Sequence, residues 1–208
     1  MLWFLRLFFK LLYHSFAWSY DLVAAIVSGG RWKEWVRSVI PLLQGQDILE
    51  LGIGTGTLQT ALVPSEFNVY GLDESRQMLR IAKNRIRGQD SSRKLLRADA
   101  KSIPLAPRCI DTIVATFPSE YIMQPDTLLS CRRVLRPGGQ MVILLGVEVG
   151  GISLQSRLLR IFYRVTGQGT PDYRMLENNL SGLAQFGFTA KIHQIQVQQD
   201  ILTVVIAV

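Results

Sequence analysis

A glycine-rich loop, Gly52-Ile53-Gly54-Thr55-Gly56-Thr57, directly follows an apolar run in the stretch ILELGIGTGTLQTAL at residues 48–62. Glycines at this spacing let the backbone turn tightly and approach a ligand closely. A dinucleotide-binding loop has the pattern G-x-G-x-x-G, and a phosphate-binding P-loop has a lysine after its last glycine. Because the third glycine here is displaced and Thr57 follows Gly56, both phosphate-binding loops fit poorly.

Three acidic residues accompany this loop, each at the end of a predicted strand: Glu50, Asp73 and Asp99. A carboxylate at Glu50 repels a pyrophosphate and attracts an ammonium or sulfonium group. Asp73 is placed to accept hydrogen bonds from a ribose diol. In a chain whose formal net charge is +7, this grouping favours a binding site for a cationic nucleoside.

These residues need a scaffold in which successive strand ends meet, and strand and helix patterns alternate from Asp47 onward. Strands that are apolar on both faces imply a parallel sheet covered by helices, with ligands bound beyond the carboxyl ends of the strands. Apolar runs predict strands at 47–51, 68–73, 94–99, 109–117 and 140–147, and helical patterns lie at 31–43, 57–62, 75–87, 126–135 and 173–186.

The C-terminal end of the chain has a different pattern. The β runs 187–197 and 201–208 are separated only by the turn QQD, which is too short for a parallel crossover and predicts an antiparallel hairpin. We therefore expect one domain with a Rossmann-like, doubly wound α/β sheet, in which five parallel strands and the hairpin form a seven-stranded mixed sheet. Residues 1–44 would form an N-terminal helical cap, and residues 45–208 the core, with a cap insertion at 146–171.

Four motifs in this order resemble those of the class I S-adenosylmethionine-dependent methyltransferases, over about residues 47–145. LELGIGTGT is similar to the family's first motif, VYGLDES to its second, LRADAKSIPL to its third and VLRPGG to the segment before the fifth strand. The final strand of the family is antiparallel, which agrees with the predicted hairpin. Tyr20-Asp21 before the helices makes the small-molecule methyltransferases of quinone biosynthesis look nearest.

The resemblance implies S-adenosylmethionine as cofactor and a role for each matching residue. The glycine loop would admit the methionine moiety, with Glu50 holding its amino group through water or the loop amides, and Asp73 would bind the ribose hydroxyls. Met78 is equally well a core residue and Asp99 a turn or cap residue. The full predicted cofactor set is Glu50, Gly52, Gly54, Gly56, Thr57, Asp73, Glu74, Met78, Asp99 and Ala100, with Thr116 and Phe117 close to the methyl donor.

Methyl transfer from a sulfonium is an in-line displacement, so the enzyme mainly aligns the acceptor and excludes water. A general base is needed only if the acceptor must lose a proton, and no catalytic residue is assigned. Glu120, Tyr121, Tyr20 and His14 flank the predicted pocket mouth, and each fits a structural role as well. The segment TFPSEY only weakly resembles the Pro-Pro tetrad of enzymes that methylate nucleobase amines, so no nucleic acid is expected as substrate.

Two amphipathic basic segments, residues 1–18 and 152–165, bear on the acceptor. Arg6 and Lys10 interrupt the first apolar stretch, which therefore fits neither a signal peptide nor a membrane-spanning helix. The segment suits a lid over an apolar pocket or a helix in a membrane interface. Together the two segments predict an apolar, basic-edged cap for a small lipophilic acceptor, such as a prenylated quinone or lipid precursor, in a cytoplasmic protein that contacts the membrane peripherally.

The remaining chemistry is sparse. Cys109 and Cys131 form no C-x-x-C pair and are expected to be reduced buried thiols, and with only His14 and His193 no metal site is expected. The basic stretch 76–97 is predicted to be a solvated helix face followed by a loop. Two rival functions stay open: an S-adenosylmethionine-binding regulatory protein without turnover, and a nucleotide-dependent oxidoreductase, which the displaced glycine disfavours.

Overall fold

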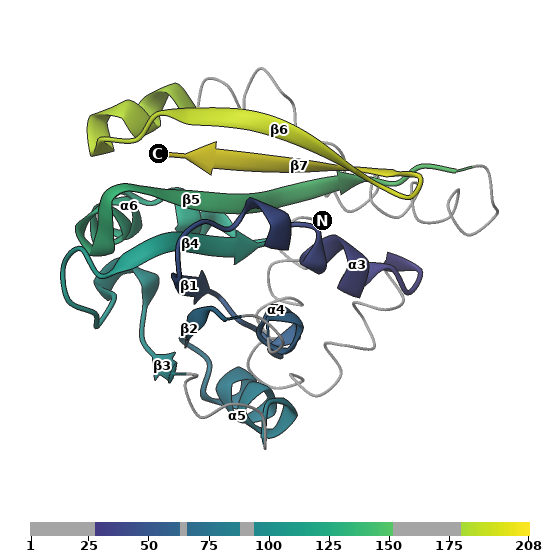
Figure 1. The fold of residues 1–208 in the computed structure, drawn as a ribbon, viewed down its shortest axis with the longest axis horizontal. Coiled ribbons are helices and arrows are strands. Elements are labelled where there is room, and N and C mark those ends of the chain that lie inside the picture. Colours follow the sequence, from purple (N-terminus) through teal and green to yellow (C-terminus); the bar gives the residue numbers. More distant parts are fainter. Residues whose placement is uncertain (1–27, 63–65, 88–93, 152–179) are drawn as a thin grey trace, which may run out of the picture.

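One continuous sheet runs through the computed structural model, which describes residues 28–62, 66–87, 94–151 and 180–208 (Figure 1). The strands coincide with runs of the sequence that contain apolar residues. The seven strands are β1 (Asp47–Leu51), β2 (Asn68–Asp73), β3 (Lys94–Arg97), β4 (Ile110–Thr116), β5 (Leu135–Glu148), β6 (Ala190–Val197) and β7 (Asp200–Ala207).

The strands lie in the order β3-β2-β1-β4-β5-β7-β6. Neighbours from β3 to β5 are parallel, whereas β7 is antiparallel to both β5 and β6. In Figure 1, β7 lies between β5 and β6 and runs opposite to β5. The predicted fold, five parallel strands and a C-terminal hairpin in one Rossmann-like mixed sheet, is confirmed.

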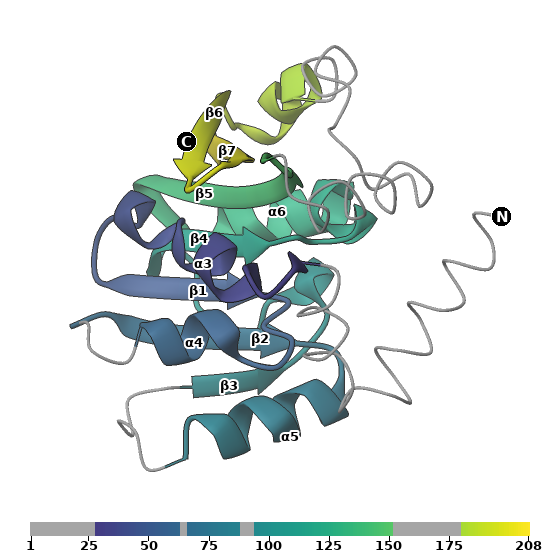
Figure 2. The same cartoon turned by 90° about the vertical axis from the view of Figure 1, so that its right-hand side faces the viewer.

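Helices cover both faces of this sheet. Figure 2 looks onto the face that carries α3 and α4, with α6 behind the sheet. The α-helices are α3 (Trp32–Arg37), α4 (Thr57–Ala61), α5 (Arg76–Arg85) and α6 (Pro125–Val134), and the 3₁₀ helices are η2 (Ile40–Leu42), η3 (Ala100–Ser102), η4 (Glu120–Met123) and η5 (Gly182–Phe186).

Three predicted elements have different bounds in the structure. The helix expected at 31–43 ends at Arg37 and resumes as η2, because Pro41 has no backbone N–H to continue the α-helical bonding. Strand β5 begins at Leu135 instead of 140, since Ile110 pairs with Leu135 and a register shift follows before Thr112 pairs with Gln140. Of the helix expected at 173–186, only its end is described, and there it is 3₁₀.

An apolar core lies on each face of the sheet. One core joins α3 and α4 to strands β1, β4, β5 and β7, with Trp35 completely buried at its centre. The other joins α6 to the opposite face and includes Phe188 and Cys131. Residues 28–44 of the predicted cap therefore contribute to the core, while residues 1–27 and 152–171 lie outside the described residues.

Candidate functional site

The glycine loop connects β1 to α4 at the carboxyl edge of the parallel strands. Gly52, Gly54 and Gly56 all have positive φ angles, of 70°, 53° and 81°, which favour glycine over any residue with a Cβ. A Cβ at Gly56 would lie 3.0 Å from the Ala82 Cβ of α5, whereas a Cβ at Gly54 would meet nothing within 4 Å. The third glycine thus serves helix packing, and the middle one faces open space.

Asp73, at the end of β2, fastens this loop. One carboxylate oxygen accepts a hydrogen bond from the Gly54 amide at 2.9 Å, and the other accepts one from the Ser75 amide at 2.8 Å. The Asp73 side chain is almost buried, with 8% of its surface exposed. The carboxylate therefore fixes the loop against the end of β2.

Glu50, one residue before the end of β1, lies beneath the loop and is 1% exposed. Its Oε2 accepts a hydrogen bond from Gln59 Nε2 of α4 at 2.7 Å. Burial raises the pKa of the Glu50 carboxyl from an ordinary value of 4.5 to about 8; the nearby Asp73 charge acts in the same direction, and the Gln59 hydrogen bond opposes both. The free protein therefore holds Glu50 largely protonated near neutral pH, ready to ionise beside a cation.

We expect this buried carboxyl to make folding stability depend on pH. Because the pKa of Glu50 is raised in the folded state, the folded protein binds more protons than the unfolded chain between pH 4.5 and about 8, and its stability falls as pH rises through that window. The Glu50→Gln variant keeps the Gln59 hydrogen bond and removes the titration. Its stability should match the wild type at pH 4.5 and exceed it at pH 8 by a few kcal/mol, at about 1.4 kcal/mol per pKa unit.

Urea unfolding curves of both proteins across this pH window measure the difference. Parallel stability curves for the wild type and Glu50→Gln would contradict a buried, neutral Glu50.

The other predicted cofactor residues divide into two groups. Thr57 is the first residue of α4, Glu74 is exposed directly after Asp73, and Thr116 ends β4 half-buried, so all three lie at the carboxyl edge. Met78 is completely buried in the core and Ala100 nearly so. Asp99 is exposed and caps η3, its Oδ1 accepting a hydrogen bond from the Lys101 amide at 2.9 Å, which is the structural alternative considered for it.

Phe117 follows β4 at the same edge and has a φ angle of 49°, an unusual conformation for an aromatic residue. Its amide donates a hydrogen bond to the Leu144 carbonyl at 2.7 Å. Its ring stacks on Trp32 of α3, with ring centroids 4.6 Å apart, and lies 6.4 Å from the Trp35 ring. Strained backbone conformations of this kind concentrate at functional sites.

Tyr121 is the catalytic candidate that the structure brings to the glycine loop. Its hydroxyl donates a hydrogen bond to the Leu51 carbonyl at 3.3 Å and would lie only 2.7 Å from a Cβ at Gly52. Glu120, its neighbour, is exposed. Tyr20 and His14 lie outside the described residues. Tyr121 therefore helps to shape the loop, and its proton is directed at the backbone.

An ionic cluster that the sequence did not indicate lies at the same edge of the sheet. Asp200, the first residue of β7, is completely buried. Its carboxylate oxygens lie 2.6 and 2.8 Å from an Arg31 guanidinium nitrogen and accept hydrogen bonds from Trp35 Nε1 at 2.8 Å and the Gly150 amide at 3.0 Å. Asp200 thus ties the start of α3 to the end of β5, beside the Trp32–Phe117 stack.

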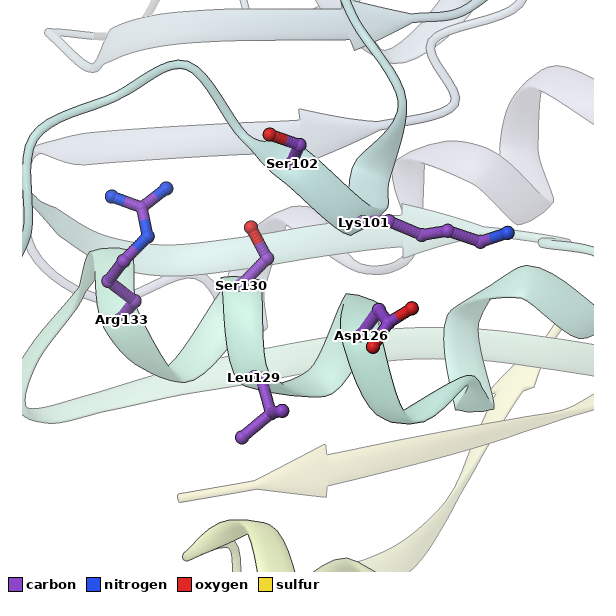
Figure 3. A pocket seen from close by; sticks show the side chains of 6 residues that line it. All are labelled: Lys101, Ser102, Asp126, Leu129, Ser130 and Arg133. Carbon is purple, nitrogen blue, oxygen red and sulfur yellow. The ribbon is translucent and has the colours of Figure 1, made fainter.

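A hollow of about 340 Å³ lies away from this edge, between η3 and α6 (Figure 3). Lys101 and Asp126 lie at one end of it and Arg133 at the other. The Arg133 guanidinium donates hydrogen bonds to the Ile103 and Leu105 carbonyls, so it is engaged in joining α6 to the loop after η3. With opposite charges at one end and a structural arginine at the other, the hollow shows no set of groups directed at a ligand.

Metal and thiol chemistry find no support in the described residues. No group of three or more His, Cys, Asp or Glu side chains is arranged there to hold a metal ion. Both cysteines are free, but only Cys131 is buried as expected, whereas Cys109 is half-buried. Burial raises the pKa of the Cys131 thiol to about 12, so it is unreactive. Among the helices in the described ranges, none has the length and apolar character that crossing a membrane requires.

Comparison with known proteins gives concordant similarities. Residues 48–139 match a family described as a methyltransferase domain. The chain is 33% identical to the ubiquinone/menaquinone biosynthesis C-methyltransferase of Azotobacter vinelandii over 141 residues, which are 64% of this chain and 56% of that protein. It is 34% identical to the demethylmenaquinone methyltransferase of Clavibacter sepedonicus over 60% of this chain and 52% of that protein. The chain thus spans about half the length of these curated relatives.

Among solved structures, the fold resembles a putative S-adenosyl-L-methionine-dependent methyltransferase of Methanococcus maripaludis, with a TM-score of 0.61, 18% identity and coverage of 91% of this chain and 90% of that chain. It also resembles a phosphoethanolamine N-methyltransferase of Haemonchus contortus bound to S-adenosylhomocysteine, with a TM-score of 0.59, 17% identity and coverage of 86% of this chain and 53% of that chain. At these identities the structures bear on the fold alone.

Proposed function

We propose that this chain, whose residues 48–139 match a methyltransferase domain, is a class I S-adenosylmethionine-dependent enzyme that transfers a methyl group from S-adenosylmethionine to a small lipophilic acceptor. The observation that carries the proposal is the junction of β1 and β2. There Asp73 holds the open glycine loop, and Glu50 lies buried beneath it. The ordered motifs of the sequence and the matched relatives support the same reading.

The residues present fit this cofactor. The open side of Gly54 leaves room for a methionine moiety against the loop backbone, and Glu50 supplies a buried carboxyl that an ammonium or sulfonium group would ionise. Asp73, at the end of β2, is a carboxylate that would accept hydrogen bonds from ribose hydroxyls. None of these groups favours a pyrophosphate, because the Asp73 carboxylate would repel its charge and none of them is positively charged.

When bound, S-adenosylmethionine supplies a methyl group already activated on a sulfonium, so the chain has to align an acceptor and exclude water. Asp73 and the glycine loop would orient the donor. Trp32 and Phe117 would present an apolar, planar wall at the same edge. We assign no general base, because the Tyr121 hydroxyl donates to a backbone carbonyl and Glu120 is exposed.

The matched relatives act on ubiquinone or menaquinone precursors by their names, and a stacked aromatic pair is a suitable surface for such a ring. We extend this acceptor class to the present chain. The location proposed is cytoplasmic, with peripheral membrane contact through residues 1–18 and 152–165. Liposome flotation of the full chain and of a chain without residues 1–18 tests this contact, and equal recovery of soluble protein in both cases would contradict it.

Methyl transfer itself is tested with the full chain, tritiated S-adenosylmethionine and detergent-solubilised demethylmenaquinol. The expected result is label in a C-methylated quinol and release of S-adenosylhomocysteine. Cofactor binding without product, over demethylquinols and total lipid extracts, would instead favour a regulatory protein without turnover. Calorimetry that finds NADH bound more tightly than S-adenosylhomocysteine would favour an oxidoreductase.

A substitution in the aromatic pair should separate acceptor binding from cofactor binding. We expect Trp32→Ala to raise the KM for the quinol about tenfold. The lost contact is the stacking of the indole on the quinol ring, and such a contact between two rings contributes roughly 0.5–1.5 kcal/mol beyond its burial. The affinity for S-adenosylhomocysteine should not change, because Asp73 and the glycine loop are untouched. Trp32→Phe keeps a ring against Phe117 and is the matched control. Steady-state kinetics and calorimetry measure the two effects, and a parallel loss of both would contradict an acceptor wall at Trp32.

A further inference from the structure

A shallow groove lies between α5 and the edge strand β3. It encloses about 300 Å³ and is lined by Arg76, Leu79, Arg80, Lys83, Leu95 and Arg97, which we call the α5–β3 groove. Figure 2 shows α5 running beside β3 at the lower edge of the sheet. Leu79 and Leu95 are half-buried, whereas the four cationic residues are exposed. The groove therefore combines a small apolar floor with a basic rim.

The cations of the rim extend beyond the groove on the same side of the molecule. Arg76, Arg80 and Lys83 recur at intervals of four and three along α5, and exposed Arg87 follows two residues after the helix ends. Lys94, exposed at the start of β3, adds a sixth positive charge. No acidic residue occurs within 75–87 or 94–98, and none of the six cations forms an ion pair within the ranges that the structure describes. Exposed Glu74 and Asp99 flank these ranges at the end near Asp73, and the six cations leave the surface positive overall. A basic surface of this density attracts an anionic partner.

The surroundings of the groove narrow the class of that partner. Strand β3 is the end of the sheet, but it is only four residues long and carries exposed Lys94 and Arg97, features that oppose pairing with a strand of another protein. Nucleic-acid single strands bind through stacking on aromatic side chains. No aromatic residue lines the groove, and the nearby Tyr70 ring lies 5.1 Å from the Lys94 ammonium. The phosphate groups of a flat anionic surface can bind without strand pairing and without stacking on aromatic rings.

The position of the groove relates it to the cofactor site. Arg76 begins α5 one residue after Ser75, whose amide binds Asp73, and Arg97 ends β3 at its pairing with Asp73. One end of the basic rim thus lies at the carboxyl edge where the cofactor residues gather. A partner surface bound to the basic rim would therefore lie close to the cofactor site.

We propose that the α5–β3 groove binds the anionic phospholipid headgroups of a bilayer and thereby places the methyl-transfer site beside the membrane. Lysine and arginine side chains near such a surface are attracted to its negative potential over about one Debye length. The proposal rests on the proposed function in one respect: a lipophilic acceptor resides in the bilayer that the groove would bind.

The test uses the full chain and sucrose-loaded vesicles of phosphatidylcholine, with and without phosphatidylglycerol. The double variant Arg80→Gln/Lys83→Gln removes two exposed charges from the rim. The matched control Lys33→Gln/Arg37→Gln removes two exposed charges from α3. We expect wild-type protein to sediment with the anionic vesicles only, the groove variant to bind at least about fivefold less, and the control to bind as the wild type does. Binding should also weaken as salt is added.

Two further measurements separate this proposal from the proposed function. All variants should keep their affinity for S-adenosylhomocysteine and their methyl transfer to a detergent-solubilised quinol, since the substitutions leave the glycine loop intact. Loss of vesicle binding in the groove variant supports the groove even if no protein transfers a methyl group. Equal vesicle binding by the groove variant and the control would overturn it whatever the activity. Binding of duplex DNA in preference to anionic vesicles, lost in the groove variant, would also overturn it in favour of a nucleic-acid surface.

Discussion

The Asp200→Ala variant should lose about 3–5 kcal/mol of its free energy of unfolding, the cost typical of removing one partner from a buried ion pair. Asp200 is completely buried, and its carboxylate binds Arg31, Trp35 Nε1 and the Gly150 amide. Its removal leaves the 12%-exposed Arg31 side chain without its counter-charge and two N–H donors without an acceptor. Equilibrium unfolding in urea measures the loss.

The reference for Asp200→Ala is Glu66→Ala, which removes a carboxylate from an exposed position. Surface changes of this kind alter stability by about 0.5 kcal/mol or less. A double-mutant cycle with Arg31→Met isolates the coupling between the two charges. If Asp200→Ala were no more destabilising than Glu66→Ala, the contacts of Asp200 with Arg31 and Trp35 would not stabilise the position of α3.

The Asp73→Ala variant should bind S-adenosylhomocysteine about 100-fold more weakly, because hydrogen bonds to a charged group contribute roughly 1.5–3 kcal/mol each. Asp73 holds the Gly54 amide of the loop, and in the proposed complex it would accept hydrogen bonds from the ribose. In Asp73→Asn, a side-chain amide would face one of the two backbone N–H groups that the carboxylate now accepts, so this variant should also bind weakly. Isothermal calorimetry measures both.

Asp99→Ala is the matched control for the Asp73 variants, since Asp99 ends the next strand region and caps only η3. The affinity of Asp99→Ala for S-adenosylhomocysteine should fall much less than that of the Asp73 variants, because the hydrogen bond of Asp99 is to η3 and not to the glycine loop. Thermal unfolding of each free protein shows whether the loop substitutions act on binding or on folding. Equal losses of affinity in the Asp73 and Asp99 variants would contradict a specific role for Asp73 in cofactor binding.

Sequence patterns predicted the sheet, its hairpin and the placement of the glycine loop beside Glu50 and Asp73. They succeed there because each strand is a local apolar run and because carboxyl ends of parallel strands share an edge. The start of β5 was missed, because the register shift opposite Ile110 is a property of strand pairing and leaves no local pattern in RPGG. The break before η2 depended on Pro41, whose effect the helical spacing of its neighbours concealed.

Asp200 shows a different limit of sequence reasoning. It ends the segment QQD, whose composition is typical of an exposed turn. Its burial depends on Arg31, 169 positions away, and on the Gly150 amide, 50 positions away. The Trp32–Phe117 stack likewise joins residues far apart in the chain. Such partners become visible only when the sheet brings α3, β5 and β7 together.

The strand order has a consequence for how this protein is made. Strand β7 follows β6 in the chain but lies between β5 and β6 in the sheet. During synthesis, β5 therefore leaves the ribosome with an open, strongly apolar edge that β6 does not pair with. That edge stays unpaired until the chain has been translated through β7, and unpaired strand edges promote aggregation of nascent chains. During the interval between the translation of β5 and β7, the nascent chain is therefore expected to be prone to aggregation.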